Sequence, residues 1–231
     1  MQCSIWCRGG CRGIRDRYTN MSRRHALPER DQDPTGFTRI LQTLIDAVPG
    51  VVGVALVDEL GECVDYCGVM DAYEIRLVAA HSQIELHNAD VRLRDGFGPL
   101  RSFTVYASKR TYFSMRIVEE YDLVLVFAGP NPSAPSLRAL AQAEFDIRVE
   151  GGWHPPRDME RWILLKVDAR PHDKWRPCRV QLAGEWHEVE VIGTVVGLSH
   201  GERGFRVSTI SGAEMTLVRE RHGNWYADVR Y

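Results

Sequence analysis

The sequence predicts an α+β unit followed by a small all-β barrel. Between residues 36 and 150, the apolar patterns run in the order helix, two strands, helix, three strands, helix. From residue 171 onward, short alternating runs are separated by glycine-containing turns, a spacing typical of a small antiparallel barrel. We therefore expect one domain over residues 36–150, a linker over 151–170 and a barrel over 171–231.

Composition and charge exclude several classes of protein. The chain has 231 residues, of which 44% are hydrophobic and 26% charged, and its formal net charge is -2. This near-neutral balance excludes a globally basic nucleic-acid-binding protein. No apolar run approaches the roughly 18 residues of a membrane span, and the opening MQCSIWCRGGCRG lacks the apolar stretch of a signal peptide. We expect a soluble, cytoplasmic protein with reduced cysteines.

The segment 1–35 is rich in arginine and has no apolar periodicity. It holds seven arginines against four acidic residues, and we expect it to be disordered. Met21 is an alternative to Met1 as the first residue of the natural protein. Intact-mass measurement of natively expressed protein distinguishes the two starts.

The middle part begins with an amphipathic helix over residues 37–48, because its apolar residues recur at i, i+3 and i+4. A Pro-Gly pair ends this helix. The next two runs, VVGVALVDEL at 51–60 and CVDYCGVM at 63–70, predict two strands of a hairpin with a glycine at its tip.

A long second helix is expected over residues 71–95, followed by strands at 100–108, 110–118 and 122–128. A last helix follows the Gly-Pro-Asn-Pro segment, and we expect Ser133 to be its N-cap. In the barrel, alternate apolar residues are expected to point inward. They are Val180, Leu182, Phe205, Val207, Met215, Leu217, Trp225, Ala227 and Val229.

The long second helix carries apolar residues on two opposite sides. One side holds Ile75, Ala79, Ser82, Leu86, Ala89 and Leu93. The other side holds Tyr73, Leu77, Ala80, Ile84 and Val91. A surface helix of a monomer needs only one apolar side, and full burial of one Leu or Ile contributes about 1.5–3 kcal/mol. The second side therefore indicates a partner, either a second copy or another protein; the alternative is that the barrel covers it.

With these elements the middle part resembles the roadblock / dynein light chain family, including its bacterial members that regulate Ras-like small GTPases. The resembling segments are LIDAVPGVVGVALVDELGECV, the long second helix and RTYFSMRIVEEYDLVLVF, within residues 36–150. The resemblance implies a five-stranded antiparallel sheet between one long helix and two helices. It also implies homodimers or heterodimers joined through the second helix and third strand, and no enzymatic active site.

The third strand fits such pairing between chains. Phe103 and Val105 are expected to face one way, and Thr104 and Tyr106 the other. An edge strand of this kind can pair with its symmetry mate, although simple protection of the edge is an alternative. The predicted interface consists of Tyr73, Leu77, Ala80, Ile84, Val91, Thr104 and Tyr106.

Residues that could carry catalysis or bind a metal are scattered. The sequence contains no G-x-x-x-x-G-K-[ST] phosphate loop and no G-x-S-x-G motif. Cys3, Cys7 and Cys11 lack the close pairing of a zinc site, and Cys63 and Cys67 are expected to be buried thiols. We expect no catalytic residue, no metal and no cofactor.

The sequence thus favours a non-enzymatic, dimeric regulatory adaptor that docks a Ras-like small GTPase or another roadblock-like protein. A structural self-assembly module without a GTPase partner is one alternative. A nucleic-acid-binding module that uses the arginines of the first 30 residues and the barrel aromatics is another. The acidic middle part disfavours it.

Overall fold

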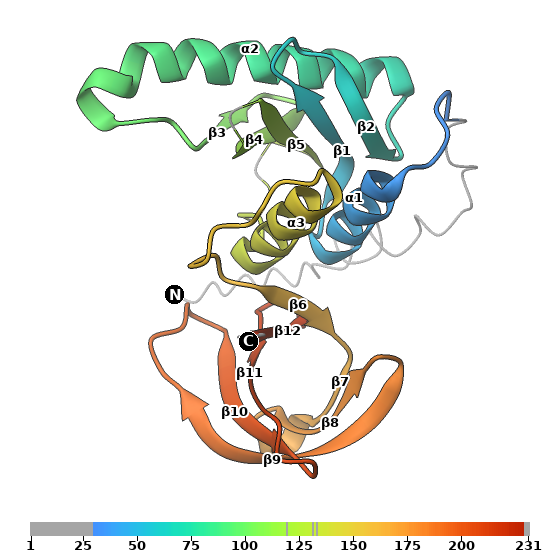
Figure 1. The fold of residues 1–231 in the computed structure, drawn as a ribbon, viewed down its shortest axis with the longest axis vertical. Helices are drawn as coiled ribbons and strands as arrows, with labels where there is room; N and C mark the ends of the chain where they lie inside the picture. Colours follow the sequence, from blue (N-terminus) through green and yellow to red (C-terminus); the bar gives the residue numbers. More distant parts are fainter. Residues whose placement is uncertain (1–29, 119, 131, 133, 229–231) are drawn as a thin grey trace, which may run out of the picture.

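A computed structural model describes residues 30–118, 120–130, 132 and 134–228. They form two units, one with three helices around a sheet and one built from a curled sheet (Figure 1). The elements of the first unit are α1 (Gly36–Ala47), β1 (Val51–Asp58), β2 (Cys63–Gly68), α2 (Ala72–Phe97), β3 (Ser102–Tyr106), β4 (Arg110–Val118), β5 (Tyr121–Ala128) and α3 (Leu137–Glu150). None of the helices in the described residues has the length and apolar composition that a membrane span requires.

The first unit is a five-stranded sheet in the order β2-β1-β5-β4-β3, and every neighbouring pair is antiparallel. Helix α2 covers one face, and α1 and α3 cover the other (Figure 1). This arrangement confirms the predicted α+β fold. Strands β2 and β3 are the two edges of the sheet.

The central strands β1 and β5 supply side chains to both faces of the sheet. Along β5, Leu123, Leu125 and Phe127 pack with α1 and α3. The alternating residues Val124 and Val126 pack in the core beneath α2. All five are at most 2% exposed. The continuous apolar runs of the sequence therefore reflect strands that are buried on both faces.

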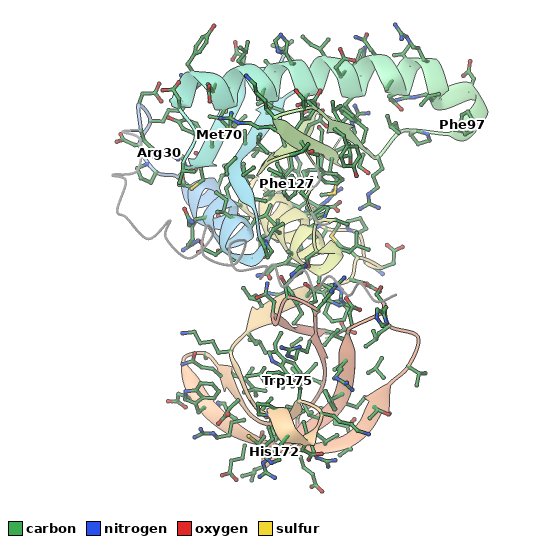
Figure 2. All side chains as sticks on the ribbon, turned by 180° about the vertical axis from the view of Figure 1, so that it is seen from behind. Arg30, Met70, Phe97, Phe127, His172 and Trp175 are labelled. Carbon is green, nitrogen blue, oxygen red and sulfur yellow. The ribbon has the colours of Figure 1, made fainter. Side chains whose placement is uncertain are left out.

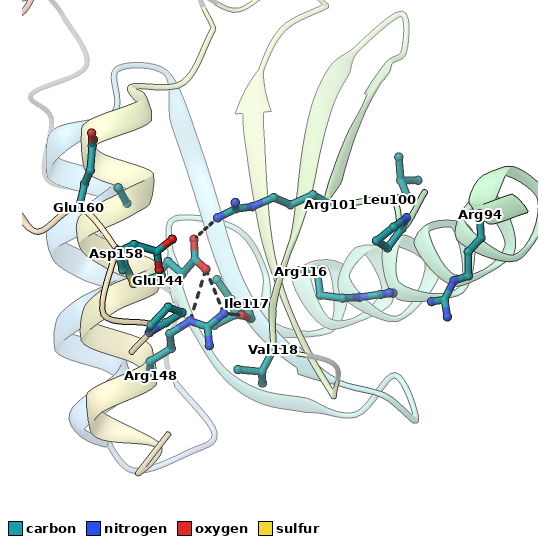
Figure 3. A pocket seen from close by; sticks show the side chains of 14 residues that line it. Arg94, Leu100, Arg101, Arg116, Ile117, Val118, Glu144, Arg148, Asp158 and Glu160 are labelled. Carbon is teal, nitrogen blue, oxygen red and sulfur yellow. Dashed lines mark hydrogen bonds and ion pairs between the residues drawn. The ribbon is translucent and has the colours of Figure 1, made fainter. Parts of the chain in front are cut away.

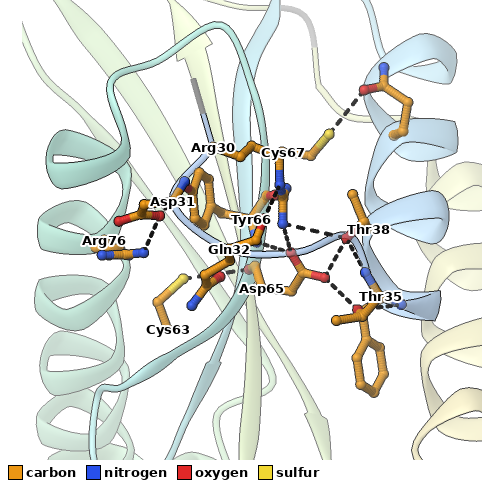
Figure 4. Close-up of polar contacts among 12 residues, drawn as sticks. Arg30, Asp31, Gln32, Thr35, Thr38, Cys63, Asp65, Tyr66, Cys67 and Arg76 are labelled. Atoms are coloured by element: carbon orange, nitrogen blue, oxygen red, sulfur yellow. Dashed lines mark hydrogen bonds and ion pairs between the residues drawn. The ribbon is translucent and has the colours of Figure 1, made fainter. Parts of the chain in front are cut away.

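The chain before α1 is held against the edge strand β2. Asp65 accepts hydrogen bonds from Arg30 at 2.7 Å and from Thr35 and Thr38 at 2.6 Å each (Figure 4). Burial alone would raise the pKa of Asp65, but these donors outweigh it and leave the pKa below its usual value. The prediction of disorder over 1–35 is therefore wrong for residues 30–35; residues 1–29, with Cys3, Cys7, Cys11 and Met21, lie outside the described residues.

Helix α3 begins later than the sequence predicted. Its N-cap is Ser136, whose hydroxyl oxygen accepts from the Ala139 N–H at 3.0 Å. The same hydroxyl donates to Glu220 of the second unit at 2.7 Å. This contact with a residue far away in the chain favours Ser136 as the cap. The expected cap, Ser133, lies outside the described residues.

Asp90 fixes the carboxy-terminal half of α2 to the strands below it. Its side chain is 3% exposed and accepts hydrogen bonds from the Leu100 N–H at 2.7 Å, from Arg116 at 3.2 Å and from Arg94. The bonds from Arg94 and Leu100 lower the pKa of Asp90 to about 2. No pattern in the sequence indicated this buried carboxylate.

The second unit is a seven-stranded curled sheet in the order β6-β12-β11-β10-β9-β8-β7. Its elements are β6 (Trp162–Leu165), β7 (Val167–Arg170), the short 3-10 helix η2 (Pro171–Asp173), β8 (Arg176–Leu182), β9 (Glu185–Val195), β10 (Arg203–Thr209), β11 (Glu214–Arg219) and β12 (Trp225–Asp228). Because only Lys166 separates β6 from β7, the two ends of the sheet belong to one continuous segment (Figure 1).

The inward residues of the barrel were predicted correctly where the structure describes them. Val180, Phe205, Val207, Leu217, Trp225 and Ala227 form its buried core, with Leu182 and Met215 partly buried beside them. Val229 lies outside the described residues. The expected linker over 151–170 is wrong in its second half, because β6 and β7 lie there. Pairing of β6 with the distant β12 makes it a strand.

The two units are joined by buried contacts. Tyr226 of β12 is fully buried in the core beneath α1 and α3. Asn224 donates to the Ala47 carbonyl at the end of α1, over 2.7 Å. Arg138 of α3 pairs with Glu202 at 2.8 Å and with Glu220 at 3.2 Å. The barrel therefore lies on the α1 and α3 side, away from α2 (Figures 1 and 2), and the alternative that it covers the second apolar side of α2 is wrong.

Replacing Tyr226 tests whether the two units unfold together. Tyr226→Ala leaves a cavity in a shared core, and we expect it to lower the free energy of unfolding by about 3–5 kcal/mol. Circular dichroism should record one cooperative transition at a lower temperature. The matched control is Ile210→Ala, since Ile210 is 86% exposed. Two separate transitions, only one of them shifted, would contradict the shared core.

Replacing Asp90 tests how much its buried charge contributes to stability. Asp90→Asn removes a buried charge with three donors, and we expect a loss of about 1–3 kcal/mol in unfolding free energy at pH 7. Because the folded pKa of Asp90 is about 2, against roughly 3.9 for an unfolded Asp, the difference between variant and parent should shrink as the pH falls below about 4. Denaturant titrations at several pH values measure this. Asp95→Asn, at an exposed position of the same helix, should have little effect; a pH-independent difference at position 90 would rule out the charge as its cause.

Candidate interaction surface

The outward side of α2 presents a row of apolar side chains. Tyr73, Leu77, Ile84 and Val91 are 72%, 43%, 50% and 64% exposed, and Ala80 between them is partly buried beside Gly61 of the β1–β2 turn. We call these five residues the outer row of α2. The helix that carries them starts at the N-cap Asp71, whose carboxylate accepts from the N–H groups of Tyr73 and Glu74.

The opposite side of α2 faces the sheet. Ile75, Ala79, Ser82 and Leu86 are at most 1% exposed there. Toward its carboxy-terminal end the helix extends beyond β3 (Figure 1). Leu93, which was expected on the buried side, is consequently 40% exposed. The two apolar sides predicted from the sequence are therefore present, one buried and one uncovered by the described residues.

The spacing of the outer row is that of a helix-pairing seam. Its members follow intervals of four, three and four residues from Tyr73 to Ile84, and Val91 lies seven residues further on. Apolar residues at alternating intervals of three and four are typical of helices that pack against another helix along their length. At 1.5 Å per residue, the row spans about 27 Å. An aligned apolar row of this length is unusual on a surface that remains in water.

Charged neighbours of the outer row are engaged elsewhere. Arg76 pairs with Asp31 at 2.5 Å, at the end of α2 that lies beside β2 (Figure 4). Glu74 pairs with Arg110 of β4 at 3.1 Å. Both are largely exposed pairs, which contribute little to stability. Their importance here is that they direct two charges away from the apolar row.

The strand residues of the predicted interface lie on the other face of the sheet. Thr104 is paired with Phe113 and Tyr106 with Thr111, and Phe113 packs on the α1 and α3 side. Since side chains alternate along a strand, Phe103 points toward α2, where its ring meets Tyr112 edge-on at 5.9 Å. The structure therefore does not bring Thr104 and Tyr106 together with the outer row. They belong instead to β3, which is an edge strand of the sheet.

An apolar groove of about 470 Å³ lies between β3 and α3. Its wall includes Tyr106, Phe113, Met115, Leu137 and Leu140. Tyr106 is 67% exposed and Leu137 is 79% exposed. The groove exists because α3 covers β5 and β4 but leaves β3 without a helix above it. Sequence reasoning missed this groove, because it depends on where α3 crosses the sheet.

Next to that groove is a larger cleft of about 1110 Å³ with four arginines in its lining (Figure 3). Buried Glu144 accepts from Arg101 at 2.8 Å and from Arg148 at 3.1 Å. Arg94 and Arg116 both bond to Asp90. Each of the four arginines is therefore bonded to a carboxylate of the chain, although Glu144 and Asp90 are each shared by two of them.

The cysteines of β2 show no sign of reactivity. Cys63 and Cys67 are half-buried rather than fully buried as predicted. Burial raises the pKa of Cys63 to about 11, so this thiol stays protonated at neutral pH. Cys67 donates to the Gln42 side-chain oxygen at 2.9 Å. In the part of the chain that the structure describes, no group of three or more His, Cys, Asp or Glu side chains is placed to hold a metal ion.

Comparison with known proteins gives results for the fold alone. No protein family matches the sequence, and no characterised protein matches it either. Among solved structures, the Roadblock/LC7 domain from Streptomyces avermitilis is 16% identical and covers 48% of this chain and 88% of its own, with a TM-score of 0.38. Myxococcus xanthus MglB is 14% identical, covers 50% and 94%, and has a TM-score of 0.43.

The gliding protein mglB from Thermus thermophilus is also 14% identical, covers 54% of this chain and 98% of its own, and has a TM-score of 0.44. These matches extend over about half of the chain. The structure thus resembles Roadblock/LC7-domain proteins in that half, as the sequence predicted, and the remainder is unmatched.

Proposed function

We propose that this protein is a non-enzymatic, dimeric regulatory adaptor that docks a Ras-like small GTPase or another roadblock-like chain. The observation that carries the proposal is the outer row of α2. It lies on a regular helix, it is apolar over its length, and the described residues leave its four large side chains, Tyr73, Leu77, Ile84 and Val91, exposed.

A second copy of the chain is the simplest partner for this row. In a two-fold symmetric pair, each copy presents the same surface to the other. The outer row is continuous enough to pack against its own symmetry mate, with Leu77 and Ile84 near the middle of the seam. Such packing removes from water the side chains that a single copy leaves exposed, and each fully buried Leu or Ile contributes about 1.5–3 kcal/mol.

The choice of a small GTPase as the regulated partner follows from the resemblance of the sequence to bacterial roadblock proteins. A dimer could act on it without a catalytic residue. Binding one conformation of the GTPase more tightly than the other shifts the population toward that conformation and so changes its nucleotide cycle. The apolar groove beside β3 remains available for such contact when α2 is occupied by a second copy.

Charge substitution in the outer row tests the dimer. Leu77→Glu together with Ile84→Glu should convert the full-length dimer into a monomer, because two carboxylates per copy would lose their hydration in the seam. Light scattering at micromolar concentration measures the mass, and circular dichroism checks the fold. The matched control is Val149→Glu with Ile210→Glu, two exposed aliphatic positions outside α2, which should stay dimeric. A parent protein that is already monomeric would refute the dimer.

Measuring GTPase binding tests the regulatory part separately. The Ras-like small GTPases of the same genome are loaded with GDP or with a GTP analogue and titrated with the parent protein. We expect at least one of them to bind about tenfold more tightly in one nucleotide state, which corresponds to about 1.4 kcal/mol. If the intact dimer bound none of the GTPases, or bound both nucleotide states equally, the regulatory role would be rejected. The protein would then be a structural self-assembly module.

A further inference from the structure

Two arginines of the barrel face each other without a counter-charge. Arg203 of β10 and Arg219 of β11 are direct partners across the two strands. Two residues further along, Phe205 and Leu217 are also partners and both belong to the barrel core. Because side chains alternate along a strand, the two arginines share that inner face, at the rim of the barrel. Like charges directly opposite each other destabilise a sheet.

The carboxylates next to them in the chain are already engaged. Glu202 precedes Arg203 and bonds to Arg138 of α3 at 2.8 Å. Glu220 follows Arg219 and bonds to the same Arg138 at 3.2 Å. No ion pair joins Arg203 or Arg219 to any residue that the structure describes. The rim therefore carries an excess of positive charge, whereas every arginine of the cleft in the first unit has an ion pair.

The guanidinium of Arg219 packs on an aromatic ring, and one of its N–H groups makes no hydrogen bond to the described residues. The guanidinium lies 3.9 Å from the centre of the Trp175 ring, and its Nε is buried without a hydrogen-bond partner among the described residues. Burial and the charge of Arg203 lower the pKa of Arg219. A buried N–H that lacks an acceptor is costly, and the cost is larger for a charged group.

The backbone beneath Arg219 is strained. Lys174 and Trp175 both have left-handed backbones, with φ of 51° and 64°, a conformation that is unfavourable for residues with a side chain. This turn places Trp175 inside the ring of barrel strands (Figure 2) and leaves Lys174 exposed beside it. The turn thus supplies an aromatic support for the guanidinium of Arg219.

We propose that Arg203 and Arg219 form a binding site for an oxyanion of the phosphate class. A phosphate group between the two guanidinium groups would neutralise their repulsion and accept from their terminal N–H groups, since the Nε of Arg219 is itself buried. Arginine is suited to this role because its planar donors match the oxygens of phosphate. The support from Trp175 fixes the orientation of Arg219 before the anion binds, which reduces the entropy lost on binding.

Thermal unfolding of the full chain in matched salts tests the site. Chloride is replaced by inorganic phosphate at constant ionic strength, so that general screening is unchanged. With phosphate about tenfold above its dissociation constant, we expect the melting temperature of the parent to rise by about 4 °C. No rise of the parent in phosphate relative to chloride would overturn the proposal.

Two variants at the exposed Arg203 locate the effect. Arg203→Gln should abolish the response to phosphate, and Arg203→Glu should abolish it and raise the melting temperature in chloride, because the new carboxylate would face Arg219. The matched control is Arg206→Gln on the outer face of the same strand, where Arg206 pairs with Glu214 at 3.2 Å; it should keep the full response. A full phosphate response in Arg203→Gln would contradict a site between the two arginines.

Discussion

The side of the sheet to which the barrel is attached determines which surfaces of the molecule are left open. The central strands β1 and β5 are buried on both faces, so each face of the sheet needs a cover. On one face, α1 and α3 form that cover together with Tyr226, which the barrel inserts into their core. On the other face, α2 is the cover that the described residues provide. The barrel is attached away from the outward side of α2, so the part of the chain that the structure describes leaves most of the apolar row there exposed.

This constraint separates the molecule into two ends with different chemistry. At the α2 end, a regular row of aliphatic and aromatic side chains suits contact with another folded surface. At the barrel end, the opposed Arg203 and Arg219 suit a small charged group. The contacts of Arg138 and Asn224 lie between these ends and hold the two units together. Each end can thus be occupied without blocking the other.

Patterns within a segment allowed the sequence to predict much of the fold. The strand expected at residues 110–118 is β4 with the same bounds. The pattern that predicts this strand lies entirely within the segment and the turns on either side of it. The two sides of α2 were also predictable, since a helix of 26 residues displays its periodicity clearly. The inner residues of the barrel followed from alternation alone.

Features that depend on distant partners were not predictable in this way. Ser136 is the cap of α3 because Glu220 lies beside it, and Asp90 is buried because Arg116 and Leu100 meet it there. Strand β6 was mistaken for a linker because its partner is β12. Thr104 and Tyr106 lie apart from the other residues of the predicted interface for a different reason. The alternation that assigned Thr104 and Tyr106 to one face was correct, but only the sheet register shows that this face lies away from α2.

The central claim is that another chain covers the outer row of α2, and hydroxyl-radical footprinting at several protein concentrations measures that cover residue by residue. Oxidation of Leu77, Ile84 and Val91 should fall as the protein is concentrated from nanomolar to micromolar. Oxidation of Val196 and Ile210, which are exposed to 87% and 86% on the barrel, should not change. Equal oxidation of the α2 residues at every concentration would contradict the account.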